Sequence, residues 1–132
     1  MTDKLELYFK AAQSAKIGIW KMNLLTNHFF WDAVTKCILE VSDDFEPSLS
    51  SAINFYTEGE NRDRIKSHMN AAISKGIPFD DKFQITTAKN NIKYIECICQ
   101  IEMIDGKPAH LLGTFQDITN EQNLINELQL NV

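Results

Sequence analysis

Features that would point to a membrane or to an export route are missing from the 132-residue sequence. No apolar run approaches the roughly 20 residues that a membrane-spanning helix needs. Residues 1–4 lead into acidic and polar positions rather than into the apolar segment of a signal peptide. We therefore expect a cytoplasmic protein that makes no direct contact with a membrane.

Cysteine is also scarce. Cys37, Cys97 and Cys99 are an odd number and lack the spacing of a zinc site. Cys97 and Cys99 lie two apart, so on a strand they share a face and are poorly placed to bridge each other. We expect reduced, buried thiols and no bound metal.

Basic residues are in the minority. Thirteen Lys and Arg face eighteen Asp and Glu, which gives a formal net charge of −5. Proteins that bind the phosphate backbone of nucleic acids usually carry a basic surface and a high pI. The composition therefore argues against a nucleic-acid partner.

No arrangement typical of an enzyme is present either. Catalysis needs a nucleophile with a base, paired carboxylates or a metal cluster. The three histidines, His28, His68 and His110, are scattered, and no glycine-rich phosphate loop occurs. Asp43-Asp44 and Asp80-Asp81 are adjacent pairs, whose side chains point apart into solvent. We expect the domain itself not to be an enzyme, although a parent protein could carry a catalytic domain.

What the chain does have is the composition of one globular domain, with 44% hydrophobic and 10% aromatic residues. Hydrophobic periodicity and turn residues predict a definite order of elements. They are a helix over residues 2–15, strands over 17–24 and 28–31, a short helix that Asp32 caps and that ends at about 41, helical turns over 48–56, and a helix over 61–75. Strands follow from 79, from about 94 and over 110–116, and a capping box starts a last helix at Thr119. We predict an α+β fold: a five-stranded antiparallel sheet with a helical middle segment, flanked by N- and C-terminal helices.

Both terminal helices carry apolar stripes. Leu5, Tyr8 and Phe9 fall at helical spacing near the N-terminus. Near the C-terminus, Ile125 and Val132 are seven apart with Leu128 between them, which is a short coiled-coil seam. These stripes either cover the protein's own sheet or form a homodimer interface. We expect a homodimer, and a C-terminal helix that continues into a longer parent protein.

In this order and spacing, several stretches resemble the PAS domain family, the sensory-box domain of bacterial signalling proteins. The resemblance covers residues 17–119. The matching stretches are Ile17-Gly18-Ile19-Trp20, residues 27–32 with Trp31, Phe45-Glu46-Pro47-Ser48-Leu49 with Phe55-Tyr56 and residues 60–65, residues 91–95, and Gly113-Thr114-Phe115-Gln116-Asp117-Ile118-Thr119. Tyr94 stands where the family usually has Trp.

The resemblance implies three parts and a role. Residues 1–16 would be a flanking helix, 17–118 a PAS sensory domain, and 119–132 the start of a signalling helix. Asp117, Ile118 and Thr119 would form the joint that passes a ligand or conformational signal to this helix. The output domain beyond it would be a histidine kinase, as in two-component systems, or a diguanylate cyclase.

The family also implies a cavity between the sheet and the helical middle, which can hold a small organic ligand. The residues expected to line it are Met22, Phe55, Met69, Ile73, Phe83, Ile85, Cys97, Cys99 and Phe115. The alternatives are a filled core in a ligand-free interaction and dimerisation module, or a sensor with haem or flavin.

Neither cofactor is favoured. His68 lies at the edge of its helix stripe, whereas the family's haem ligand falls nearer Ile65. The helical middle lacks the Asn-Cys-Arg motif of flavin-binding photosensory domains, and Cys37 lies on an earlier helix.

Overall fold

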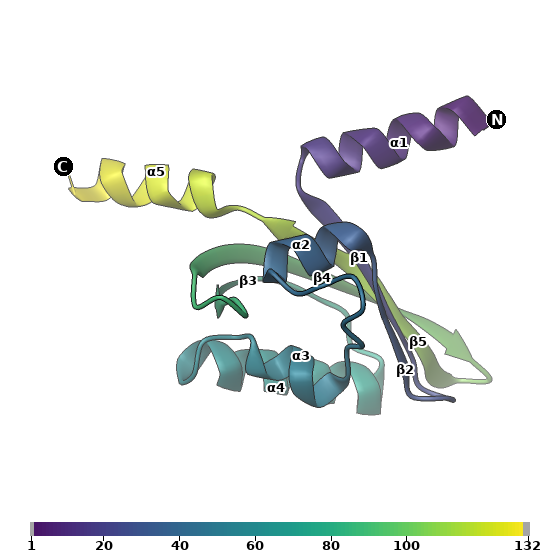
Figure 1. Ribbon diagram of the computed structural model, residues 1–132. Helices are drawn as coiled ribbons and strands as arrows, with labels where there is room; N and C mark the ends of the chain where they lie inside the picture. The colour runs from purple at the N-terminus through teal and green to yellow at the C-terminus, as the bar shows by residue number, and fades with distance from the viewer. Residues whose placement is uncertain (1, 131–132) are drawn as a thin grey trace.

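The computed structural model describes residues 2–130, which form five helices and one five-stranded antiparallel sheet (Figure 1). The helices are α1 (Thr2–Ser14), α2 (Ala33–Leu39), α3 (Leu49–Asn54), α4 (Glu60–Lys75) and α5 (Thr119–Leu130), and the strands are β1 (Ile17–Asn23), β2 (His28–Trp31), β3 (Phe79–Thr86), β4 (Ile92–Ile104) and β5 (Lys107–Asp117). The strand order is β2-β1-β5-β4-β3. This arrangement confirms the predicted fold class.

The sheet is built as its alternating pattern predicts. Along β4, the side chains of Ile95, Cys97 and Cys99 are buried on one face, and Glu96 and Ile98 point to the other. The expectation of buried thiols is confirmed for Cys97 and Cys99 and is wrong for Cys37, which is exposed on α2. Asp105 and Gly106 both have positive φ and connect β4 to β5 in a tight hairpin. Helices α2, α3 and α4 cover the buried face of the sheet, and the core lies between these two layers (Figure 1).

Helix α2 is fixed at both ends by side chains. The carboxylate of Asp32 accepts a hydrogen bond from the backbone N–H of Thr35 at 2.9 Å, which confirms the predicted cap. The helix ends at Leu39, two residues before the predicted end, because Glu40 adopts a left-handed conformation. The Glu40 carboxylate then binds the side chains of Thr87 and Asn91, which ties α2 to the β3–β4 hairpin.

Two glycines allow close approach between elements. A Cβ atom on Gly18 would lie 2.1 Å from the hydroxyl oxygen of Thr35, so this glycine lets α2 sit directly on β1. A Cβ atom on Gly113 would lie 1.7 Å from the carbonyl oxygen of Ile98. Neither position has room for a side chain.

The terminal helices extend away from the sheet layers instead of covering the open sheet face (Figure 1). Helix α5 buries none of its residues, and α1 contacts the sheet mainly along β1. Among residues 2–130, no helix combines the length and apolar character needed to cross a membrane.

Candidate functional site

A small cavity lies in the core between the sheet and the helical middle. Its volume is about 40 Å³, and its wall is almost entirely apolar. The lining residues are Trp20, Phe29, Trp31, Thr35, Leu39, Leu49, Ala52, Ile53, Phe55, Tyr56, Ile65, Met69, Cys97 and Phe115. Most of them belong to β1, β2, β4, β5, α2, α3 and α4. A molecule in the cavity would therefore contact side chains from most elements of the domain.

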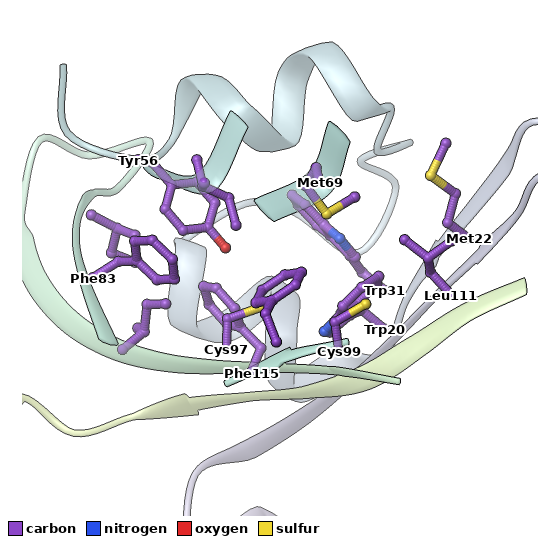
Figure 2. Close-up of a cluster of buried hydrophobic side chains, with 14 of the residues drawn as sticks. Trp20, Met22, Trp31, Tyr56, Met69, Phe83, Cys97, Cys99, Leu111 and Phe115 are labelled. Atoms are coloured by element: carbon purple, nitrogen blue, oxygen red, sulfur yellow. The ribbon is translucent and has the colours of Figure 1, made fainter. Parts of the chain in front are cut away.

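Tyr56 brings a hydroxyl group into this apolar space. Tyr56 is only 7% exposed, and its oxygen points toward the middle of the buried cluster, near Cys97 (Figure 2). The chain around it is held against β3 by two backbone hydrogen bonds, from Thr86 N to Phe55 O at 2.8 Å and from Thr57 N to Gln84 O at 3.1 Å. The ring packs edge-on against Phe83, with 5.1 Å between ring centroids. The hydroxyl position is therefore set by the sheet.

The ionisable groups at the cavity stay neutral at physiological pH. Burial raises the pKa of the Tyr56 hydroxyl well above its ordinary value, and the neighbouring Cys97 thiol adds to the rise. Burial likewise raises the pKa of Cys97 to about 12. The hydroxyl of Thr35, also in the lining, donates to the carbonyl of Ile19 at 3.3 Å. The cavity therefore contains no charge.

Aromatic rings form one wall of the cavity. Trp31 stacks on Phe45 at 5.5 Å and contacts Phe55 at 6.0 Å, while Phe29 packs between Trp20 and Trp31. The indole N–H of Trp20 donates to the carbonyl of Thr114 at 3.3 Å, which anchors this wall to β5. Such rings are large and rigid, so they define the shape of the space.

The wall contributed by α3 is only partly buried. This helix has a capping box between Ser48 and Ser51 but no fully buried residue. Its lining side chains, Leu49, Ala52 and Ile53, are all partly exposed. Segments with few buried contacts open at low free-energy cost. The route between cavity and solvent therefore runs past α3.

The predicted cavity residues divide into two groups. Phe55, Met69, Cys97 and Phe115 line the space. The others pack in the core around it: Met22, Phe83, Ile85 and Cys99 are buried, and Ile73 is partly buried. Tyr56, Trp20 and Trp31 also line the cavity but were not among the predicted lining residues.

His68 lies outside the cavity. Its Nε2 atom is 2.9 Å from the carboxylate of Asp81, and its ring stacks on Phe79 at 4.6 Å. Arg64 binds the same carboxylate oxygen at 2.7 Å and lies over the ring of Phe83. The prediction that Asp81 is solvated is wrong, because α4 folds onto β3 and brings these two partners to it.

This cluster joins α4 to β3. Burial alone would raise the pKa of Asp81, but hydrogen bonds from His68, Arg64 and the backbone of Lys82 outweigh it and hold the pKa below its usual value. The pKa of Arg64 is raised, first by its hydrogen bond to Glu60. Within residues 2–130, no group of three or more His, Cys, Asp or Glu side chains is arranged to hold a metal ion.

The predicted joint at the end of β5 is a compact set of hydrogen bonds. The Asp117 carboxylate accepts from the backbone N–H of Thr119 at 2.9 Å and from its hydroxyl at 2.5 Å. The Thr119 oxygen also accepts from the backbone N–H of Tyr94 at 3.1 Å, and the Tyr94 carbonyl accepts from Ile118 N at 2.8 Å. The expected capping box is not formed, because the Thr119 hydroxyl is turned toward β4.

The apolar stripes of the terminal helices face solvent. Leu5 and Tyr8 are 55% and 63% exposed on α1, and Ile125 and Leu128 are 44% and 60% exposed on α5. The side chain of Phe9 and all of Val132, which complete the predicted seam, lie outside the described part of the structure. The open sheet face carries further exposed apolar side chains, namely Ile19, Phe30 and Leu112.

Comparison with known proteins relates this fold to sensory domains. No family model and no curated protein matches the sequence. Among solved structures, a sensory box histidine kinase/response regulator from Burkholderia thailandensis E264 superposes with a TM-score of 0.74 at 18% identity, covering 94% of this chain and 93% of that one. The N-terminal domain of a diguanylate cyclase with PAS/PAC sensor from Marinobacter aquaeolei gives 0.72 at 16% identity, covering 80% and 98%.

A PAS domain of a protein from Colwellia psychrerythraea gives a TM-score of 0.63 at 17% identity, covering 88% of this chain and 98% of that one. Each of these three superpositions extends over nearly the whole of the chain compared with this one. The protein therefore has the PAS fold, as the sequence resemblance predicted.

Proposed function

We propose that the chain is a cytoplasmic sensory and dimerisation module of a larger signal-transduction protein, and that it passes the state of its core to α5. The output domain that follows α5 would be a histidine kinase or a diguanylate cyclase, as in the proteins whose sensor domains share this fold. Catalysis would belong to that output domain. The observation that carries the proposal is the hydrogen-bonded joint between the sheet and α5.

The joint lies close to the cavity along the same two strands. Cys97 and Phe115, which line the cavity, face each other across β4 and β5. Two residues further along, Ile95 pairs with Asp117, the residue that binds Thr119. Two residues of strand span about 7 Å. A displacement of the cavity wall therefore has a short, rigid path to the first turn of α5.

Helix α5 is free to respond. It buries no residue, so its direction depends on the bonds of the joint rather than on packing against the domain. A helix of 12 residues without tertiary packing is only marginally stable in water. Pairing with a second copy would give the apolar stripe of α5 the contacts that the domain does not supply.

The homodimer proposal rests on the exposed stripes of α1 and α5. Leu5 and Tyr8 on one helix and Ile125 and Leu128 on the other are large apolar side chains that the described part of the chain leaves exposed. Clustered apolar groups of this kind mark interaction surfaces. A second copy presents the same stripes, and a symmetric pairing buries both at once.

A ligand-free interaction module is the second candidate, favoured by the small size of the cavity. An apolar cavity that takes up benzene measures about 150 Å³, and the one described here measures about 40 Å³. Haem and flavin are far larger than benzene. The geometry supports a very small ligand, or none, over either cofactor.

The dimer and its link to output can be tested together. The chain would be fused through α5 to a diguanylate cyclase domain, which acts as a pair, and compared with a Leu128→Glu variant. Leu25→Glu, at an exposed leucine in the β1–β2 turn, is the matched control. We expect a dimer in sedimentation equilibrium that Leu128→Glu weakens at least tenfold, with loss of cyclase activity. A monomeric parent fusion, or equal effects of the two variants, would contradict the proposal.

A further inference from the structure

The hydrogen-bond partner of the Tyr56 hydroxyl is the Cys97 thiol. Tyr56 lines the cavity, and its oxygen points into the buried cluster of side chains (Figure 2). Its polar neighbour is the Cys97 thiol, and sulfur is a weak acceptor. Buried polar groups normally have a partner. A buried donor that is held only by a weak acceptor, at the edge of a cavity, is able to bind a stronger acceptor placed in that cavity.

We infer that this cavity binds a small uncharged molecule of about three or four non-hydrogen atoms, apolar except for one acceptor atom, and that Tyr56 donates a hydrogen bond to that atom. A water molecule needs about 10–15 Å³ of such space, so about 40 Å³ holds roughly three water-sized groups. Short alcohols, ketones and aldehydes have this size and chemistry. The inference deepens the proposed function by naming the class of ligand sensed.

The lining determines the charge of the ligand. No Lys, Arg, His, Asp or Glu side chain is among the lining residues. A charged molecule would lose its hydration without gaining a counter-ion, which is strongly unfavourable. A wholly apolar molecule would fit but would leave the Tyr56 hydroxyl with only the weak sulfur acceptor of Cys97. A neutral molecule with one acceptor satisfies both the wall and the hydroxyl.

The ligand position also fits the path to α5. Cys97, beside the Tyr56 hydroxyl, and Phe115, its cross-strand partner, form the wall nearest the joint. A molecule bound to Tyr56 therefore contacts the two strands that hold Asp117 and Thr119. Entry past α3 disturbs only partly exposed side chains.

The test compares two probes of nearly equal shape: propanone, which has an acceptor oxygen, and 2-methylpropene, which has none. The chain would be labelled with ¹³C at its methionine methyl groups and titrated with each probe. Met69 lines the cavity, whereas Met22 and Met103 lie elsewhere and serve as internal references. Because so few atoms bind, we expect millimolar dissociation constants.

Tyr56→Phe removes the hydroxyl and keeps the ring. We expect it to weaken propanone binding about three- to tenfold, the usual effect of one lost hydrogen bond, and to leave 2-methylpropene binding unchanged or tighter. Tyr94→Phe, at a tyrosine outside the cavity, should change neither. Ala52→Leu, which fills the cavity and keeps the hydroxyl, should abolish binding of both probes.

Two results would overturn the inference. The first is that Met69 responds to neither probe, and the second is that Tyr56→Phe affects both probes equally. The same spectra distinguish failure of the ligand site from failure of the proposed signal transfer. Probe binding at Met69 without any change in the amides of residues 118–130 would support the ligand site and count against signal transfer through the joint.

Discussion

Replacing Thr119 by valine should loosen the connection between the sheet and α5 while leaving the core intact. The substitution keeps the shape of the side chain but removes two hydrogen bonds, one to the Asp117 carboxylate at 2.5 Å and one from the backbone N–H of Tyr94 at 3.1 Å. Each typically contributes about 1 kcal/mol, with more for the bond to a charged acceptor. We therefore expect a loss of about 1–3 kcal/mol, concentrated at the joint. The bond from Thr119 N to Asp117 remains.

The assay is amide hydrogen exchange together with ¹³Cα chemical shifts along residues 118–130. In Thr119→Val, helical shifts should decrease along α5 and the amide of Tyr94 should exchange faster, whereas protection along the buried part of β4 stays as in the parent chain. Thr114→Val, on the open face of β5, is the matched control and should change neither. Unchanged α5 shifts in Thr119→Val would refute the reasoning, because α5 would then be held by something other than this joint.

The remaining predictions concern the core, the thiols and the charged cluster. Gly113→Ala should lower the thermal midpoint sharply or prevent folding, because its Cβ would lie 1.7 Å from a β4 carbonyl oxygen. A thermal midpoint within about 3 °C of that of the parent chain would contradict this. Iodoacetamide at pH 8 should modify exposed Cys37 but not Cys97 and Cys99, whose pKa values burial raises to about 12; native mass spectrometry should show one adduct, and three after denaturation. Asp81→Asn should destabilise the protein at pH 5, with a difference in urea midpoint that narrows toward pH 3.5. A lowered folded-state pKa contributes stability above the unfolded pKa, roughly 4, and that stability is lost as the pH falls through the folded value. A difference in urea midpoint that stays constant between the two pH values would contradict a stabilising role of the Asp81 charge.

The parts of the fold that depend on local pattern were predictable from the sequence. Alternating apolar residues define β3 and β4, Asp105-Gly106 forms the hairpin turn, and the Asp32 carboxylate caps α2. Each signal acts between residues close together in the chain, so it is visible without knowledge of the tertiary structure.

What could not be predicted depends on contacts between distant segments. Glu40 ends α2 early because its carboxylate reaches Thr87 and Asn91, about 50 residues away. The Thr119 hydroxyl turns from its own helix to the backbone of Tyr94. Spacing alone does not reveal such partners.

The cavity illustrates the same limit. Apolar periodicity indicates that Met69 and Cys97 point inward, and the family resemblance implied that both, with Phe115, line a cavity. Which inward side chains leave space between them depends on how the layers pack. Tyr56 was missed as a lining residue because its hydroxyl enters the core only once the segment after α3 pairs with β3.

If the state of the core reaches α5, a substitution that fills the cavity should alter α5 without any ligand. Cys97→Leu enlarges a side chain in the cavity wall on β4, and Ile98→Leu changes the neighbouring side chain on the open face of the same strand. Backbone amide shifts of residues 118–130 and the dimer dissociation constant would be measured for both. We predict that Cys97→Leu changes both quantities and that Ile98→Leu changes neither. Shifts confined to the cavity wall, with α5 and the dimer unaltered, would contradict the claim.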